Sequence, residues 1–233
     1  IKAIELVYIK MKNEILKLWR AKQLRVNFFI GLLMSFMMIV LIYLNPSSTD
    51  IFFRVMFFYF IETSVVSVCY MKFMGLEANY IALLSTHPFS MMQLFENKWR
   101  TAFVLVLLPS LLLLPLLIKG LVEWYEIVAV FIYVMSFVVL GHYGALFFVS
   151  KMRYDHVSLT MNYEGKALWY SNILQMICLF FLLLLVGLLG IEKSCFLISI
   201  MGILGILLRK KYFRFLCNQF KARYYVLIEK WMC

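Results

Sequence analysis

A chain of 233 residues with 64% hydrophobic residues and a formal net charge of +11 is far more apolar than a soluble globular domain, for which about 45–50% is typical. Apolar segments and their connectors use almost the whole length, so no separate soluble catalytic or ATP-hydrolysing domain is expected within these residues. The composition therefore predicts one compact membrane-embedded bundle that receives any energy from another chain.

Residues 1–25 are the first predicted element, a basic amphipathic helix. Apolar residues recur there at steps of three and four along one face, and lysine, asparagine and arginine occupy the other. Such a helix lies in the headgroup plane with its apolar face toward lipid. We expect an interfacial helix that braces the first membrane span; a polar lead-in without a role is the alternative.

Six apolar stretches follow and predict an all-α membrane protein with six transmembrane helices. Five have the roughly 17–25 residues that a helix needs to cross a hydrocarbon layer about 30 Å thick. Backbone groups at that depth must satisfy their own hydrogen bonds, which favours helices over open strands. The sixth rises only about 21 Å, so its flanking cations must snorkel to the interface. The predicted spans are residues 26–44, 51–70, 101–118, 127–149, 168–190 and 195–208.

The distribution of lysine and arginine predicts the orientation. Residues 1–25, 71–100, 150–167 and 209–233 hold 20 of the 23 Lys and Arg residues, and these segments lie on one side of a six-span chain. Because basic loops stay in the cytoplasm, both termini are expected inside a bacterial cytoplasmic membrane. Attraction to anionic lipid headgroups accounts for the net charge, so no nucleic-acid partner is expected.

Two ionisable residues within the predicted spans are candidate functional groups. Glu62 is the only carboxylate deep in any span, where an ionisable side chain is costly and faces the bundle interior. Its expected partners are Tyr59, Thr63 or His142, and it is either functional or a protonated side chain that joins two helices. His142, beside Gly144 in the fourth span, is expected to be packed and hydrogen-bonded rather than a ligand. No metal spacing is present, so no metal or cofactor is expected.

The cytoplasmic loop at residues 76–98 is predicted to be an ordered helix–corner–helix. Residues 76–86 favour a short helix, and Pro88 ends it because proline disfavours helical angles in the residue before it. Ser90 then matches an N-cap, and Gln93 completes a capping box. A stiff elbow of this kind suits a membrane subunit that receives force from a cytoplasmic partner; an interfacial hairpin without a partner is the alternative.

Residues 209–233 predict a second basic amphipathic helix. No glycine or proline occurs between Ile206 and Cys233, so the sixth span is expected to continue into this tail as one helix. The apolar stripe of the tail consists of Tyr212, Phe215, Leu216, Phe220, Tyr224, Leu227, Ile228 and Trp231.

The elbow and the span count together resemble the coupling region of type II ABC exporter permeases. In that family a helix with a leucine pair and a Thr/Arg-x-Pro-x-Ser corner follows the second span, and a lysine precedes the third. The matching residues are Glu77, Leu83, Leu84, Thr86, Pro88, Ser90 and Lys98. The resemblance implies an export permease that a separate cytoplasmic ABC ATPase energises through the elbow. The expected ATPase-coupling residues are Glu77, Tyr80, Ile81, Leu83, Leu84, Pro88, Ser90 and Gln93.

A second resemblance is to an uncharacterised permease family of Bacteroidota with an Asn-Tyr-x-Gly segment before the fifth span, here Asn162 to Gly165. Its members are longer, so the start at Ile1 without a methionine is expected to mean that an N-terminal half is missing. That half, a second copy or a related subunit is the expected second transmembrane unit. One departure from type II exporters is the connector at residues 191–194, which leaves no room for re-entrant helices.

The chain is not expected to be an enzyme, because it has no Walker, HExxH, GxSxG or paired-carboxylate motif. Two other functions remain open. One is a non-transporting scaffold or assembly subunit of a larger complex. The other is an intramembrane enzyme that uses Glu62 and His142 as an acid–base pair. An adjacent gene for a Walker-type ATPase would favour the permease.

Overall fold

The computed structural model describes residues 16, 19–20, 22–44, 51–78, 91–144 and 165–222. This part of the chain consists of helices and short turns, without a β-strand. The helices are α2 (Lys22–Leu44), α3 (Ile51–Ala78), α5 (Met91–Leu112), α6 (Leu114–Ile118), α7 (Trp124–Tyr133), the π-helical turn η1 (Val134–Val138), α8 (Val139–His142), α9 (Gly165–Leu189) and α10 (Ile191–Ala222).

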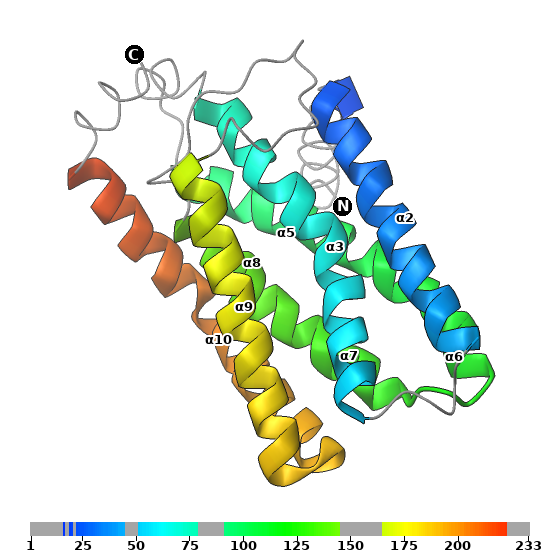
Figure 1. Cartoon of the computed structure of the whole chain (residues 1–233). Helices are drawn as coiled ribbons and strands as arrows, with labels where there is room; N and C mark the ends of the chain where they lie inside the picture. The colour runs from blue at the N-terminus through cyan, green and yellow to red at the C-terminus, as the bar shows by residue number, and fades with distance from the viewer. Residues whose placement is uncertain are drawn as a thin grey trace, which may run out of the picture.

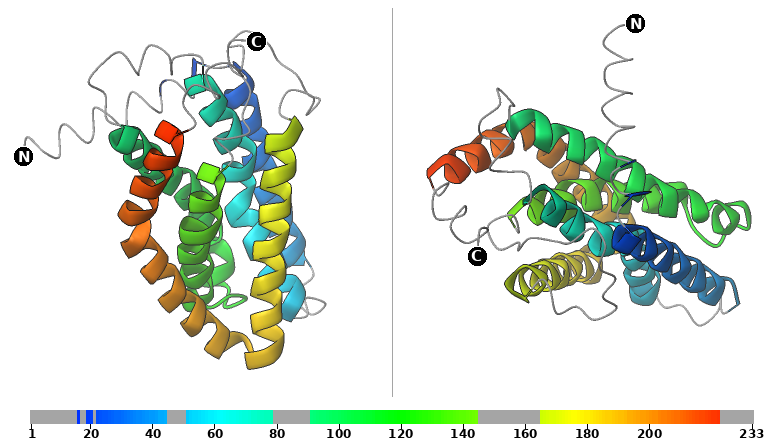
Figure 2. Two further views of the ribbon diagram at one scale, coloured as in Figure 1. Left: turned by 90° about the vertical axis from the view of Figure 1, so that its left-hand side faces the viewer. Right: turned by 90° about the horizontal axis from the view of Figure 1, so that it is seen from above.

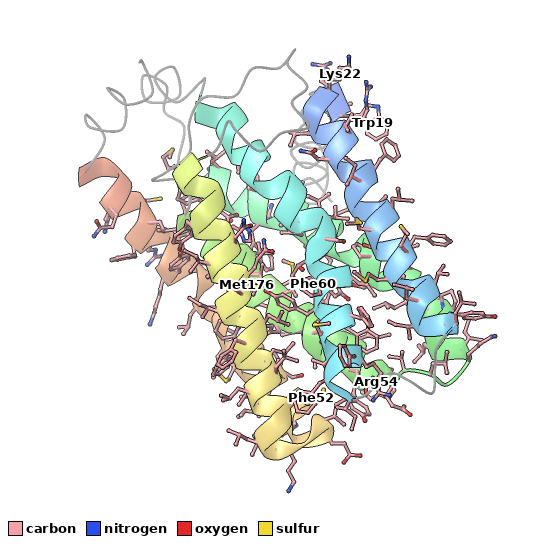
Figure 3. All side chains as sticks on the ribbon, in the orientation of Figure 1. Trp19, Lys22, Phe52, Arg54, Phe60 and Met176 are labelled. Atoms are coloured by element: carbon pink, nitrogen blue, oxygen red, sulfur yellow. The ribbon has the colours of Figure 1, made fainter. Side chains whose placement is uncertain are left out.

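The long helices pack side by side, and consecutive ones run in opposite directions. In Figure 1, α2 lies beside α3, and α9 lies beside α10. Seen from above, α5 lies at the back of the bundle, on the side away from α9 (Figure 2). Lys22 and Trp19 lie at the opposite end of the bundle from Arg54 and Phe52 (Figure 3). This alternation is the arrangement of a chain that crosses the same layer repeatedly.

Five helical segments are long and apolar enough to cross a membrane, among the residues whose side chains the structure describes. Many of their large apolar side chains face outward: Phe180 and Phe196 are each 70% exposed. Apolar surface on this scale is unfavourable in water and is normal against lipid. The chain is therefore a multi-pass membrane protein. The five segments are Leu24–Leu44, Met91–Ile118, Trp124–His142, Asn172–Leu189 and Ile191–Gln219.

Helix α2 begins before the predicted first span. It starts at Lys22, and Leu24 is fully buried in the core, although residues 1–25 were expected to lie in the interface. The ring of Trp19 lies edge-on to that of Phe29, with 5.9 Å between the centroids. The chain thus enters the bundle about one helical turn earlier than hydropathy indicates. The rest of the predicted interfacial helix lies outside the described residues.

The third predicted span consists of two helices. Pro109 lies within α5, and the chain then turns at Leu113 before α6. Pro115 has no N–H to donate to the carbonyl four residues earlier, so the ladder of helical hydrogen bonds stops there. The same proline sits in the first turn of α6, where a missing N–H has no consequence. Ser110 therefore lies near a weakened end of α5.

The fourth span contains a widened turn. α7 begins after Glu123, whose N–H donates to Oε2 of Glu126 at 3.4 Å, and Val134–Val138 is π-helical. α10 packs directly on this turn, because a Cβ added at Gly205 would lie 2.9 Å from Cβ of Ser136. π-Helical turns inside α-helices occur frequently at functional sites. Residues 145–149 of the predicted span lie outside the part that the structure describes.

α10 is longer than the predicted sixth span. It has 32 residues, from Ile191 to Ala222, so the span and the described part of the tail form one helix as predicted. Only Gly190 separates it from α9, and its φ of 77° is a conformation that favours glycine. The hydroxyl oxygen of Ser194 lies 2.8 and 2.6 Å from the carbonyl oxygens of Leu185 and Gly190, which share its one hydrogen. Residues 191–194, predicted as a connector, thus form the first turn of α10.

Candidate functional site

Glu62 lies inside the bundle, with one hydrogen-bonding neighbour among the residues that the structure describes. Its side chain is 0% exposed, and the hydroxyl of Ser110 on α5 lies 2.7 Å from its Oε2. Oε1 is buried and has no hydrogen-bond partner among the residues that the structure describes. Burial of a carboxyl group costs most when the group is charged and unpaired. Glu62 and Ser110 therefore make a polar contact between α3 and α5 in an apolar surrounding.

The partners that the sequence suggested for Glu62 bond to other groups. The hydroxyl of Tyr59 donates to the carbonyl oxygen of Gln175 on α9 at 2.9 Å. Thr63 donates to the carbonyl of Tyr59, one turn back on its own helix, at 2.7 Å. Ser110 was not among the expected partners, because a serine in an apolar span can satisfy its hydroxyl on its own helix and produces no pattern in the sequence.

His142 is fully buried at the end of α8. Its Nδ1 lies 2.5 Å from the carbonyl oxygen of Val138, and a carbonyl can only accept, so Nδ1 carries the hydrogen. Nε2 lies 3.5 Å from Nε2 of Gln175 on α9. Glu62 and His142 thus have different partners, on α5 and α9. No contact between these two side chains is seen in the described bundle.

Two tyrosines hold α9 against the centre of the bundle. Besides Tyr59, Tyr133 of α7 donates to the carbonyl oxygen of Cys178 at 2.8 Å, and the two rings lie 6.5 Å apart. The accepting residues, Gln175 and Cys178, are neighbours on one face of α9. A helical carbonyl can accept a second hydrogen bond, so these contacts join α9 to α3 and α7 without disturbing its own ladder.

The first turns of α5 are tied to α8 and α10. The hydroxyl of Tyr143 donates to the carbonyl of Phe95 at 2.7 Å. The ring of Phe213 lies 4.8 Å from that of Tyr143 and 5.8 Å from that of Phe95. The guanidinium of Arg209 lies 4.4 Å over the ring of Trp99, a contact worth about 0.5–2 kcal/mol. A displacement of the start of α5 would therefore reach both neighbouring helices.

The predicted elbow lies only partly within the described residues. Glu77 belongs to the last turn of α3, and Gln93 is exposed in the first turn of α5. Lys98 is 0% exposed, although the sequence indicated only a lysine in front of the span. Such a fully buried lysine is itself a functional candidate. Outside the described residues lie Tyr80, Ile81, Leu83, Leu84, Thr86, Pro88 and Ser90.

An ion pair occupies the opposite end of the bundle. Nη2 of Arg54 lies 2.6 Å from Oε1 of Glu126, and the side chain of Glu126 is 2% exposed against 26% for Arg54. Nε of Arg54 is buried without a hydrogen-bond partner. The sequence reading missed this pair because Glu126 lies just outside the predicted fourth span, so it was not counted as an intramembrane charge.

No group of three or more His, Cys, Asp or Glu side chains that could hold a metal ion occurs within the ranges that the structure describes. Cys178 and Cys195 are buried thiols without a disulfide among the described residues. The contacts of the bundle therefore consist of helix packing, hydroxyl groups and a few buried ionisable side chains. No protein-family model, curated protein or solved structure matches the chain.

Proposed function

We propose that the chain is the membrane-spanning permease subunit of an ABC-type exporter, energised by a separate cytoplasmic ATPase. The observation that supports this most is the course of α5. It starts at Met91, within the predicted elbow at residues 76–98, and carries Ser110 to the buried carboxyl group of Glu62. A single helix thus leads from the cytoplasmic elbow to the polar contact inside the bundle. The elbow is also the segment that resembles the coupling region of type II exporters.

In this proposal α3 is a further membrane span, which makes six. It has 28 residues, more than the roughly 20 that a span needs, and it lies beside α2 in the bundle (Figure 1). Both termini then face the cytoplasm of a bacterial inner membrane, because the basic segments at Lys22 and Arg209 lie on that side. Arg54 and its partner Glu126 lie toward the outer face.

The contacts of α5 provide the route for coupling. Movement of the elbow by the ATPase would displace the start of α5, and the cluster of Phe95, Tyr143 and Phe213 would carry this to α8 and α10. The break at Leu113 separates α5 from α6, so the outer segment need not follow. A transition between two packings of this kind is the usual way in which a small shift at one site is amplified.

A second membrane unit is part of the proposal. One bundle of this size is small for enclosing a translocation path, and α2 presents large apolar side chains outward, with Leu33 at 59% and Phe36 at 56% exposed. The unit is a second copy, a related subunit or an N-terminal half of a longer chain. Native mass spectrometry in mild detergent distinguishes these, because each predicts a different mass.

Crosslinking from the elbow tests the proposed function. A cysteine at Ala82 or Ser85, in a chain whose native cysteines are replaced, would be coupled to a photoreactive crosslinker in native membranes. Mass spectrometry should then identify an ATPase with a Walker sequence. The matched control is Lys193→Cys in the first turn of α10, at the other end of the bundle, which should give no such product.

The alternatives give different products. Crosslinks only to lipid or to another membrane protein would favour the scaffold subunit. If the ATPase is captured, its ATP hydrolysis and transport should be uncoupled by Trp99→Ala, because this variant loses the contact between α5 and Arg209. Normal coupling in that variant would reject the route through α5.

A further inference from the structure

The hydroxyl of Ser110 has two oxygen neighbours. It lies 2.7 Å from Oε2 of Glu62 and 2.9 Å from the carbonyl oxygen of Val106, one turn back on α5. A serine hydroxyl carries one hydrogen and can donate only one full hydrogen bond. A backbone carbonyl has no hydrogen to give. A second full hydrogen bond at this hydroxyl therefore requires a hydrogen from Glu62; otherwise the two acceptors share the hydrogen of Ser110, as the carbonyls of Leu185 and Gly190 share that of Ser194.

The protonation state of Glu62 decides whether both contacts are satisfied. With a carboxylate, both neighbours of the hydroxyl would be acceptors and would have to share its one hydrogen. With a carboxylic acid, Oε2 donates to Ser110, and Ser110 donates to Val106, so each contact contains one hydrogen. The remaining Oε1 is then the carbonyl oxygen of the acid, and its lack of a partner costs much less than that of a charged oxygen.

Among the residues that the structure describes, no cationic side chain pairs with Glu62. Arg54 bonds to Glu126, and Arg209 stacks on Trp99. Lys98 lies about 18 Å from Ser110 along the axis of α5. The other ionisable groups on the helices around α3 have partners of their own. Glu96 and Arg100 pair with each other on α5, and His142 bonds to the carbonyl of Val138. The hydroxyls of three tyrosines donate to backbone carbonyls, and α9 adds the Cys178 thiol; the tyrosines are Tyr133, Tyr143 and Tyr170.

We propose that Glu62 and Ser110 form an intramembrane proton-binding site, occupied in this structure, whose proton holds α3 against α5. On release, the O–H bond of Glu62 breaks, its electron pair stays on Oε2, and the proton passes to a water molecule that enters beside Oε1. The carboxylate then needs hydration, which requires space between the two helices. α5 can yield at this point, because Pro109 leaves the carbonyl of Leu105 without its helical donor. The site stands independently of the proposed ATPase coupling.

Infrared spectroscopy tests the occupancy of the site. The full chain, in vesicles of phosphatidylcholine and phosphatidylglycerol, should show a carboxylic-acid carbonyl band at neutral pH. Glu62→Gln should abolish the band, whereas Glu126→Gln, which alters a buried carboxylate paired with Arg54, should leave it. Absence of the band in the wild type would overturn the proposal, because Glu62 would then be a carboxylate, either hydrated or bound to a cation. Survival of the band in Glu62→Gln would also overturn it.

A distance measurement tests the consequence for the helices. Spin labels at Phe60 on α3 and Leu107 on α5, each 37% exposed, report the separation between the two helices. Raising the pH should lengthen this distance in step with the loss of the acid band. Glu62→Gln keeps a donor for Ser110 but cannot ionise, so its distance should be independent of pH. Ser35→Ala, which changes the contact on α2 instead, should respond as the wild type does.

Two outcomes count against the helix movement. One is a wild-type distance that stays constant while the acid band disappears. The other is a Glu62→Gln variant that opens with pH as the wild type does. If Glu62→Gln does not fold, the pH titration of the wild type is a sufficient test by itself. The acid band and the distance are recorded on the same sample, and the proposal requires that they change together.

Discussion

A close backbone approach between α2 and α3 predicts the effect of one added methyl group. A Cβ at Gly31 of α2 would lie 2.9 Å from Cα of Val65 and 3.0 Å from the carbonyl oxygen of Ser64 on α3. These are backbone atoms and cannot rotate away, so Gly31→Ala must push α2 and α3 apart. The same movement stretches the contact between Ser35 and Ser64, whose hydroxyls lie 2.5 Å apart.

The magnitude follows from these two effects. Overpacking by one methyl group against a rigid neighbour destabilises by about 1–3 kcal/mol. An interhelical hydrogen bond in a membrane contributes about 0.6 kcal/mol on average. Replacement of glycine by alanine in a helix interior also stabilises by up to about 1 kcal/mol, so a second glycine variant is needed as the reference.

Gly187→Ala is the matched reference, because its added Cβ would lie 3.4 Å from Cζ of Phe52, an ordinary contact with a side chain. The stabilisation that alanine gives through its higher helix propensity is common to both variants and cancels in their difference. Gly31→Ala should therefore be less stable than Gly187→Ala by about 1.5–3.5 kcal/mol. Reversible unfolding in mixed micelles with increasing dodecyl sulfate, followed by circular dichroism, measures this difference. Equal unfolding midpoints for the two variants would refute the close packing of α2 on α3.

Three further outcomes are expected. Replacing Arg54 by leucine should destabilise by about 3 kcal/mol, because Glu126 is left buried and unpaired, and leucine at both positions should restore most of the loss; no loss in the single variant would contradict this. Tyr143→Phe should lower stability by about 1 kcal/mol in the same micelle assay, since its hydrogen bond to α5 disappears. In a cysteine-free background, a membrane-impermeant thiol reagent outside the cell should label Lys193→Cys but not Lys210→Cys, and the reverse result would invert the orientation.

Much of the secondary structure could be predicted from the sequence. Runs of apolar residues long enough to cross a bilayer have one stable backbone form, because the helix satisfies its own hydrogen bonds. The helices α2 and α3 accordingly cover the predicted spans 26–44 and 51–70, and α9 covers all of the span 168–190 except its last residue. The helix ends differ more from the predicted span boundaries. α2 and α10 start before their predicted spans, and α10 continues through the first part of the tail. Hydropathy cannot place these ends, because an amphipathic segment can extend a span as easily as lie beside it.

The candidate site was predictable only in part. Glu62 was identifiable because a lone carboxyl group in an apolar segment is energetically unfavourable in the membrane for any rotation of its helix. The hydrogen-bond partner of Glu62 depends on which helix packs against α3 and on how that helix is rotated. In the structure this helix is α5, and the partner is Ser110 instead of His142. The close approach at Gly31 and the ion pair between Arg54 and Glu126 likewise join residues far apart in the chain.

The sequence by itself thus determined that the chain is helical, apolar and asymmetric in charge, because these properties depend on each segment separately. The tertiary structure decided which polar side chains meet. In an apolar bundle each buried hydroxyl or carboxyl group has few partners within reach, and helix rotation selects among them. The packing of α5 on α3 places the hydroxyl of Ser110 between Glu62 and the carbonyl of Val106, and no pattern within either helix alone predicts this contact.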